Sequence, residues 1–298
     1  MELINYTNCP CCGAAAVSFR LSAKDFTVSQ QEFPVWECGR CTARFTQRAP
    51  VQEEIGRYYQ ADNYISHTDT RKGLINTLYH AVRNITLAGK GKLVRKKVQK
   101  QTGALLDIGA GTGAFCHFMK KKGWQVTGLE PDEATRERAA SLHKIQLRSA
   151  RDLFDFPAQS FDAITLWHVL EHVHELHRYL DQIRTLLRPA GRVFIALPNY
   201  TSYDASVYRD HWAAYDVPRH LYHFSPQAMK QLLEQHRLIL VSHVPMWYDS
   251  FYVSMLSEQY RTGKAGYIRA AGVGLLSNLK ALFNPKRCSS VVYVAAPY

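Results

Sequence analysis

Four cysteines near the N-terminus have the spacing of metal ligands. Cys9 and Cys12 form one C-x-x-C turn, and Cys38 and Cys41 form a second one further along the chain. Cys11 also lies in the first turn, but the spacing favours Cys9 together with Cys12. Two such turns place four thiolates around one tetrahedral ion, which leaves no position open for chemistry. The spacing therefore predicts a structural zinc ion in a small zinc ribbon.

A glycine-rich turn predicts a binding site for a nucleoside-containing cofactor. The sequence DIGAGTG at 107–113 follows a short apolar strand and precedes a helical pattern. Glycine lets the backbone approach a ligand closely, and the ligand then lies at a helix N-terminus beside the carboxyl ends of the strands. The turn alone does not choose the cofactor, because Gly109, Gly111 and Ala114 also satisfy the dinucleotide fingerprint.

Histidines are the candidates for general-base chemistry. The segment 203–225 is rich in aromatic residues and carries three histidines between a strand and a helix, where a substrate pocket belongs. A neutral imidazole accepts a proton near neutral pH. His220 and His223 are the first candidates and His168 is the third. For each of them alone, a hydrogen-bonded structural role is at least as good an interpretation.

The elements that must position these residues alternate between strands and helices from residue 103 onward. Expected helices cover 114–122, 133–142, 173–187 and 226–236, and expected strands cover 104–108, 125–129, 145–147, 161–167, 192–197, 238–243 and 290–295. Strands separated by such helices predict a parallel sheet that is covered on both faces. The expected fold class is α/β, a Rossmann-like seven-stranded, mostly parallel sheet with an antiparallel edge.

Pattern and composition divide the chain into three parts. We expect a zinc ribbon over 1–48, a helical bridge over 49–100, and a main domain over 101–298 with a helical insertion at about 245–287. In the bridge, 51–59 and 74–87 have helical spacing, which Gly89 and Gly91 are expected to interrupt. The sequence shows no secretory signal and no apolar run that could span a bilayer, so we expect a cytoplasmic location.

The net charge of +12 suits an anionic partner. Much of the excess lies in KGKLVRKKVQK at 90–100, although a solvated helix face explains that stretch equally well. The insertion contains an unusually apolar run at 270–276 with basic residues around it. Packing helices, a lid, a dimer face and contact with a membrane surface are all open interpretations of this run.

Three features resemble class I S-adenosylmethionine-dependent methyltransferases over about residues 105–244. The turn that Asp107 opens is similar to the D-x-G-x-G-x-G signature, and Glu130 ends the second expected strand, where a carboxylate can bind ribose hydroxyls. The sequence SFD at 160–162, followed by LWHVLEH at 166–172, is similar to the fourth-strand pattern of that family. The resemblance implies S-adenosylmethionine as the cofactor rather than a nicotinamide.

The resemblance also implies roles for individual residues. The glycine turn would line the methionine end of the cofactor, Glu130 would bind the ribose, and the segment 149–151 would flank the adenine. Trp167 and His168 would lie beside the methionine or the substrate. The implied cofactor-binding residues are Asp107, Gly109, Ala110, Gly111, Gly113, Glu130, Ala150, Trp167 and His168.

The sequence PRHLYHFS at 218–225 resembles a segment found in ubiquinone-biosynthesis O-methyltransferases and zinc-containing sugar C-methyltransferases. In the sugar enzymes a related HEHLSYFS segment supplies a catalytic histidine and glutamate. His220 matches the second histidine of that segment, whereas Arg219 replaces the glutamate and His223 replaces a tyrosine. These departures put C-methylation in doubt.

The leading hypothesis is an enzyme that transfers methyl from S-adenosylmethionine to a small-molecule acceptor such as a sugar, lipid or quinone-like precursor, by O- or C-methylation. The alternative is a nucleic-acid-directed methyltransferase or an RNA-binding protein that would grip phosphates with the ribbon and the basic stretch. Neither C-x-x-C turn is flanked by dense lysine and arginine, which disfavours a nucleic-acid partner. A third possibility is a cofactor-binding protein without turnover or a zinc-dependent interaction module.

Overall fold

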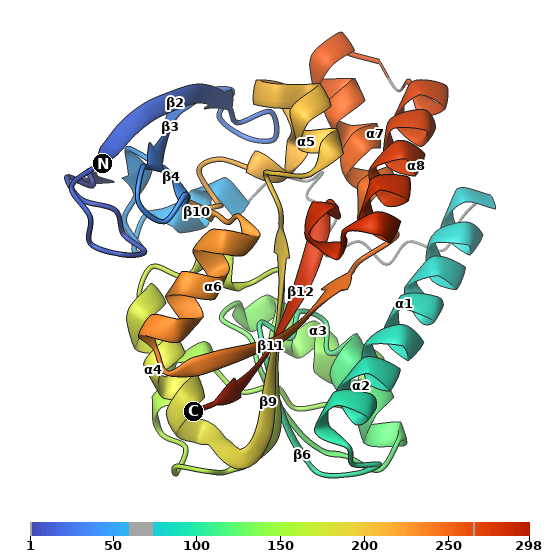
Figure 1. Ribbon diagram of the computed structural model, residues 1–298. Coiled ribbons are helices and arrows are strands. Elements are labelled where there is room, and N and C mark those ends of the chain that lie inside the picture. The colour runs from blue at the N-terminus through green and yellow to red at the C-terminus, as the bar shows by residue number, and fades with distance from the viewer. Residues whose placement is uncertain (1, 60–73, 265) are drawn as a thin grey trace.

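A six-stranded sheet forms the centre of the computed structural model, which describes residues 2–59, 74–264 and 266–298 (Figure 1). Its order is β11-β12-β9-β8-β6-β7. The four strands from β7 to β9 are parallel, and β12 pairs antiparallel with both β9 and β11. The bounds are β6 (Ala104–Ile108), β7 (Gln125–Leu129), β8 (Phe161–Trp167), β9 (Leu187–Pro198), β11 (Leu238–Pro245) and β12 (Ser290–Pro297). The expected α/β fold with a mostly parallel sheet is confirmed.

The sheet contains one strand fewer than the seven expected, within the part of the chain that the structure describes. Residues 145–147 were the expected third strand, but this region makes only an isolated parallel bridge between Leu129 and Arg148. Ile145 and Leu147 instead pack against Cys116 of the helix 114–121 and Ala139 of the helix 133–143. Their apolar character therefore reflects burial under helices and not a place in the sheet.

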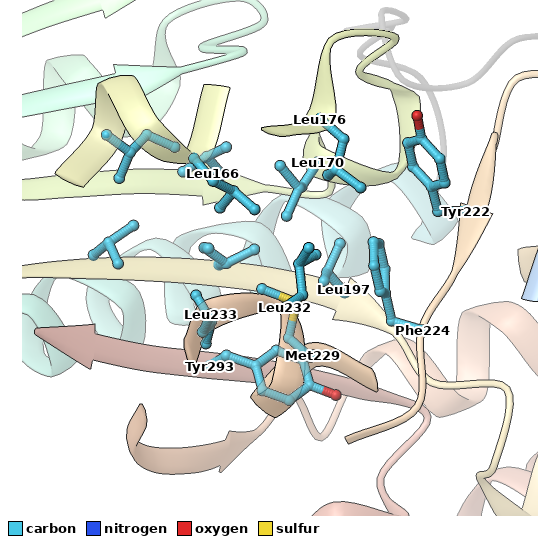
Figure 2. Packing of buried hydrophobic residues seen from close by; sticks show 14 of the residues in the cluster. Leu166, Leu170, Leu176, Leu197, Tyr222, Phe224, Met229, Leu232, Leu233 and Tyr293 are labelled. Carbon is cyan, nitrogen blue, oxygen red and sulfur yellow. The ribbon is translucent and has the colours of Figure 1, made fainter. Parts of the chain in front are cut away.

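Helices cover both faces because the strand side chains alternate between them. Leu106 and Ile108 of β6 pack in the cluster that contains α4 and α6, whereas Leu105 packs in the cluster with α1 and α2. Figure 2 shows β-strand leucines facing Met229, with the aromatic rings of the segment before α6 closing one end. The helices are α1 (Leu74–Val98), α2 (Ala114–Lys121), α3 (Glu133–His143), α4 (Leu176–Leu186) and α6 (Pro226–Gln235).

Helix α1 continues through Gly89 and Gly91, where an interruption was expected. A Cβ atom at Gly91 would lie 3.2 Å from the Met119 sulfur and would also contact the Phe118 ring of α2. This glycine therefore allows α1 and α2 to pack closely, and packing outweighs the low helix propensity of glycine. In the other expected bridge helix, 51–59, only the 3-10 helix η1 (Ile55–Tyr59) forms.

The N-terminal region forms two small antiparallel sheets. One joins β1 (Leu3–Ile4) to β5 (Ala49–Pro50), and the other has the order β10-β4-β3-β2. Strands β2 (Val17–Lys24), β3 (Glu32–Cys38) and β4 (Arg44–Thr46) come from the N-terminal region, but β10 (Tyr222–His223) comes from the segment before α6. The N-terminal sheet is therefore completed by a strand of the main domain.

Three further helices lie beside the carboxyl edge of the central sheet (Figure 1). Helix α5 (Tyr203–Tyr208) follows β9, and the insertion between β11 and β12 forms α7 (Asp249–Thr262) and α8 (Tyr267–Phe283). The two insertion helices pack against each other and against α5. None of the described helices combines the length and the apolar character that a bilayer span requires.

Candidate active site

The glycine-rich turn connects β6 to α2 and leaves room for a ligand beside its backbone. Gly109, Gly111 and Gly113 have φ angles of 70°, 52° and 75°, in the region that favours glycine. A Cβ atom at Gly109 would collide with Val169, whereas a Cβ at Gly111 would meet no atom within 4 Å. The turn is thus packed on one side by the segment after β8 and open at Gly111.

Glu130 faces this turn from the end of β7. Its two carboxylate oxygens accept the backbone N–H groups of Gly111 at 2.9 Å and of Asp132 at 3.2 Å. Burial raises the pKa of Glu130, and these N–H bonds oppose the rise. Each carboxylate oxygen retains further acceptor capacity, so the carboxylate can also receive hydroxyl groups of a ligand.

Asp107 points into the protein and not toward the open side of the turn. Thr165 donates its hydroxyl to this carboxylate at 2.6 Å, and the Cys116 thiol donates at 3.4 Å. Burial raises the pKa of Asp107 to about 6 although both bonds favour the charged form. Its position behind the glycine turn indicates that Asp107 shapes the turn by anchoring β6 to β8.

The segment expected to flank an adenine lies next to Glu130. The backbone N–H of Glu130 donates to the carbonyl of Arg148 at 2.9 Å, and Ser149 caps the 3-10 helix η3 (Ala150–Phe154). Ala150 therefore follows directly after the chain crossing at the end of β7. The segment, the glutamate and the glycine turn converge at the carboxyl edge of the sheet, as the sequence predicts for a nucleoside site.

Trp167 ends β8 on the other side of the turn. The Lys90 ammonium lies 4.3 Å from the centroid of its ring, and Phe115 packs against it edge-on at 5.4 Å. Burial lowers the pKa of Lys90, while Asp249 and Asp107 counteract that shift. Lys90 belongs to the basic stretch at 90–100, yet its charge lies over an aromatic ring at the site.

His168 is held between two carboxylates. Its Nε2 lies 3.1 Å from Asp249 Oδ2, and its Nδ1 lies 3.4 Å from Glu171 Oε1. Burial opposes its protonation, but the two carboxylates outweigh burial and raise the pKa of His168 to about 9. A histidine that is already protonated at neutral pH cannot accept a proton, so this geometry favours a positioning role over the expected role as a base.

Glu171, His172 and His220 meet in a cluster beside His168. One side-chain ligand atom from each of the three lies within 4.8 Å of the others. His172 donates from Nδ1 to the Arg219 carbonyl at 3.0 Å, and His220 donates from Nδ1 to the Ala214 carbonyl at 2.9 Å. Because a carbonyl oxygen only accepts, each imidazole in its neutral form carries its lone pair on Nε2.

The cluster contains acceptors without a matching donor. Glu171 is buried, its Oε2 has no hydrogen-bond partner in the described structure, and its Oε1 has only the long 3.4 Å ion pair with His168. Burial lowers the pKa of His172 to about 4, so its imidazole is neutral. Buried acceptors require a donor or a cation. A substrate hydroxyl would satisfy them, and two imidazoles with a carboxylate are also a suitable ligand set for a divalent transition metal.

His223 lies in a different environment from His220. Thr46 donates its hydroxyl to the His220 carbonyl at 2.7 Å and lies 3.1 Å from His223 Nε2, so that nitrogen is the donor in the second bond. Burial, with a smaller contribution from the positive charge of Arg44, lowers the pKa of His223 well below its usual value. The geometry favours a structural role for His223, which fastens β10 to β4.

Arg219, which stands where the sugar enzymes have a glutamate, also points away from the cluster. Its guanidinium lies 2.6 Å from Asp216 Oδ1 and 3.1 Å from Asp25 Oδ1, and it donates to the Tyr58 carbonyl at 2.9 Å. These bonds join the β2–β3 hairpin to the loop that carries His220. Arg219 therefore holds the N-terminal region against the site and contributes no acid or base to it.

The four expected thiols converge. The sulfur atoms of Cys9 and Cys41 are 3.6 Å apart, as are those of Cys12 and Cys38. Tetrahedral zinc with Zn–S bonds of about 2.3 Å places its sulfurs about 3.8 Å apart, so these residues fit the ion. Backbone N–H groups also donate to three of the sulfurs, which suits thiolates. Cys11 is buried but lies outside this group.

Sequence reasoning missed four residues at the site. Glu171 and His172 belong to the LWHVLEH sequence, whose adjacent acid and imidazole offered a signal that received no role. Lys90 was grouped with other lysines by composition, although its helix brings it to Trp167. Asp249 carried no local signal, because its contact with His168 joins residues 81 positions apart.

Comparison with known proteins identifies the family. A family model described as a methyltransferase domain matches residues 81–243, more than half of the 298-residue chain. Ubiquinone biosynthesis O-methyltransferase of Rhodopseudomonas palustris (strain TIE-1) is 29% identical over 140 residues, which cover 44% of this chain and 55% of the relative. The human mitochondrial ubiquinone biosynthesis O-methyltransferase is 29% identical over 165 residues, covering 49% and 44%. The chain thus spans about half the length of these curated relatives.

A solved structure agrees at the level of the fold. The crystal structure of the PH0226 protein from Pyrococcus horikoshii OT3 matches with a TM-score of 0.50 and 14% sequence identity, over 78% of this chain and 95% of that chain. The chain therefore belongs to the methyltransferase domain family, and its resemblance to class I S-adenosylmethionine-dependent methyltransferases is confirmed.

Proposed function

We propose that the protein transfers the methyl group of S-adenosylmethionine to a hydroxyl group of a small molecule. The observation that carries this proposal is the cluster of Glu171, His172 and His220, where the buried carboxylate of Glu171 has an oxygen, Oε2, without a donor. Glu171 and His172 come shortly after Val169 in the chain, and the Val169 side chain packs against the glycine turn at Gly109. An acceptor hydroxyl that enters the cluster would lie beside the cofactor turn.

The turn and its neighbours are suited to the cofactor. Gly109, Ala110, Gly111 and Gly113 would let the methionine end approach the backbone, supported from behind by Asp107. Glu130 would accept the ribose hydroxyls while it keeps its bond from the Gly111 N–H. Ala150 would border the adenine, and Trp167 would border the methionine end. When bound, the cofactor supplies an electrophilic methyl group on a sulfonium, so transfer needs only an aligned and deprotonated nucleophile.

His220 is the proposed general base. The acceptor oxygen would use a lone pair to form the new bond to the methyl carbon while the carbon–sulfur bond breaks and its electron pair remains on sulfur. The hydroxyl proton would pass to His220 Nε2, whose lone pair is directed by the Nδ1–H bond to Ala214. The Glu171 carboxylate would then stabilise the protonated imidazole, and His168 would hold Glu171 in place.

The N-terminal thiols would bind one structural zinc ion. Their four sulfurs fill a tetrahedral coordination sphere, which leaves no site for a substrate. The region they stabilise pairs with the site loop through β4 and β10, and the Thr46 N–H donates to the Leu221 carbonyl at 2.9 Å. The ribbon would thus hold the loop that carries His220, and its role would be mechanical.

The choice of acceptor class rests on the site and on the relatives. Both curated relatives are named for O-methylation in ubiquinone biosynthesis, which supports a hydroxyl acceptor. A sugar, lipid or quinone-like precursor remains within the proposal, and the net charge of +12 suits an anionic one. The basic stretch supports a nucleic-acid acceptor less than its composition suggests, because its first lysine, Lys90, lies over the Trp167 ring.

Calorimetry and single-turnover transfer test this function. We expect S-adenosylmethionine and S-adenosylhomocysteine to bind with micromolar affinity and NADH not to bind, and we expect Glu130→Ala to weaken binding at least about tenfold through lost hydrogen bonds to the ribose. With a hydroxyl acceptor found by screening, His220→Gln should lower the transfer rate by about 10²–10⁴ at unchanged cofactor affinity.

His211→Gln is the matched control, because His211 lies in the same loop but is only half-buried and pairs with the exposed Asp210. It should leave both affinity and rate unchanged. Preference for NADH would refute the cofactor assignment. Full activity of His220→Gln would refute only the assignment of the base.

A further inference from the structure

Helix α8 is oriented with its small residues inward and its large apolar residues outward. The buried face consists of Ala270, Val273, Gly274, Ser277 and Ala281, of which Val273 alone is a larger apolar residue. A Cβ at Gly274 would lie 2.8 Å from the Phe251 ring and 3.1 Å from the Phe251 Cα, so the backbones of α7 and α8 approach closely there. A surface helix normally turns its large apolar side chains toward the core. Here the contact with α7 uses small residues instead.

The outward face consists of large apolar side chains spaced at helical intervals. Ile268 is 92% exposed at the beginning of the helix, and Phe283 is 91% exposed at its end. Between them the exposed residues continue the stripe along the helix. The full outward set is Tyr267, Ile268, Leu275, Leu276, Leu279, Leu282 and Phe283. A contiguous exposed apolar face of this kind marks an interaction site.

The charges around this face have a single sign. Residues 261–287 contain six lysines and arginines and no aspartate or glutamate. Arg261 and Arg269 pair with the buried Glu258 at 2.6 and 3.7 Å. Lys264, Lys280 and Lys286 form no ion pair with a carboxylate in the described part of the chain. The apolar face is therefore bordered by three lysines that no carboxylate of the described residues neutralises.

We propose that the protein docks on an anionic lipid bilayer through the outward face of α8. The axis of α8 would then lie parallel to the membrane plane. The apolar stripe would enter the boundary between headgroups and acyl chains, and the lysines would contact anionic headgroups, as in amphipathic interfacial helices. Helix α8 has 17 residues and is about 25 Å long. A helix that spans a bilayer needs roughly 20 residues, or about 30 Å. The helix therefore fits a surface position.

A second copy of the chain is a poorer occupant of this face. A two-fold contact would place the same surface of each copy against the other, because such interfaces are self-complementary. Lys280 and its basic neighbours would then face their own counterparts with no acidic residue of 261–287 to separate them. Such juxtaposition of like charges is unfavourable. An anionic surface complements both the apolar and the charged residues.

The docking helix is connected to the active site through α7. Asp249, the first residue of α7, lies 3.1 Å from His168 Nε2, and α8 packs along α7. Lys280 on α8 lies 5.0 Å from the centroid of the Tyr203 ring, which belongs to the helix after β9. Docking through α8 would thus keep the carboxyl edge of the sheet close to the lipid surface.

Vesicle co-sedimentation of the full-length protein tests the proposal. We expect binding to phosphatidylcholine vesicles with about one third phosphatidylglycerol, and at least about fivefold weaker binding to pure phosphatidylcholine. The double variant Leu279→Ser with Phe283→Ser should lower the partition coefficient at least about tenfold. Lys280→Gln with Lys286→Gln should lower it by a similar factor and flatten its salt dependence.

Phe19→Ser is the matched control, because Phe19 is an exposed aromatic residue on β2, outside the insertion. It should bind vesicles like the unmodified protein. Unchanged thermal unfolding and S-adenosylmethionine affinity of each variant show that the fold is intact. Equal binding to both lipid mixtures, or none to the anionic one at low salt, overturns the proposal. A dimer that both double variants dissociate also overturns it, in favour of a second copy.

Discussion

The ion pair between His168 and Asp249 predicts a raised pKa for His168, and this pKa can be measured to decide whether His168 can act as a base. Asp249→Asn keeps the size of the side chain but removes the charge that lies 3.1 Å from His168 Nε2. Burial alone would lower the pKa of His168, and Asp249 is the larger of the two carboxylate contributions that raise it to about 9. Without that carboxylate, we expect the pKa of His168 to fall toward its ordinary value of about 6.5.

The magnitude follows from the difference between the folded and unfolded pKa values. A rise from 6.5 to about 9 corresponds to about 3 kcal/mol of folding free energy as an upper limit. Because the His168 side chain is 33% exposed, solvent screens the pair, and the loss in Asp249→Asn should be about 1–2 kcal/mol. This stabilisation is complete below about pH 6.5 and is lost as the pH rises through about 9.

Titration and denaturation of the cofactor-free protein measure both effects. The imidazole resonance of His168 should titrate near pH 9 in the unmodified protein, and the unfolding free energies of protein and variant should converge above that pH. Asp210→Asn is the control, because Asp210 pairs at 3.0 Å with His211 but its side chain is 55% exposed, against 24% for Asp249. A His168 that titrates at or below its ordinary value would refute the reasoning and restore His168 as a candidate base.

Two further predictions concern the turn and the thiols. Gly109→Ala should abolish cofactor binding and lower the free energy of unfolding by about 1–3 kcal/mol, because the added Cβ collides with Val169 and the backbone there is left-handed. Gly111→Ala adds backbone strain alone, so thermal unfolding should show a smaller loss of stability. Cys38→Ser should release one equivalent of zinc, measured with a chromophoric chelator, and lower the midpoint temperature of unfolding. Cys11→Ser should retain the metal, because Cys11 lies outside the four-thiol group. Zinc retention in Cys38→Ser would contradict the four-thiol site.

The local parts of the candidate site could be predicted from the sequence because each depends on neighbouring residues. The turn at 107–113 needs glycine at three left-handed positions, and Glu130 lies at the end of the next strand, so both follow from strand order in a parallel sheet. The paired C-x-x-C turns likewise specify a tetrahedral thiol site by spacing alone. These features converge in the structure as expected.

Local pattern was insufficient where burial and pairing compete. The apolar residues at 145–147 suggested a strand, but their side chains fill the space beneath α2 and α3. Gly91 suggested a helix interruption, but the close approach of α2 requires a residue without a side chain there. A periodic pattern records only which residues are apolar, and two environments can bury the same residue type.

The sequence by itself determined the fold class, the cofactor turn and the cysteine spacing, because these depend on short-range chemistry. Only the tertiary structure separated the three histidines, which have equal intrinsic basicity. His168 lies between two carboxylates, His223 hydrogen bonds to Thr46, and His220 bonds the Ala214 carbonyl through Nδ1 beside Glu171 and His172. Each of these environments is formed by residues far apart in the chain, and the local electrostatic field and hydrogen-bond partners decide what an imidazole can do.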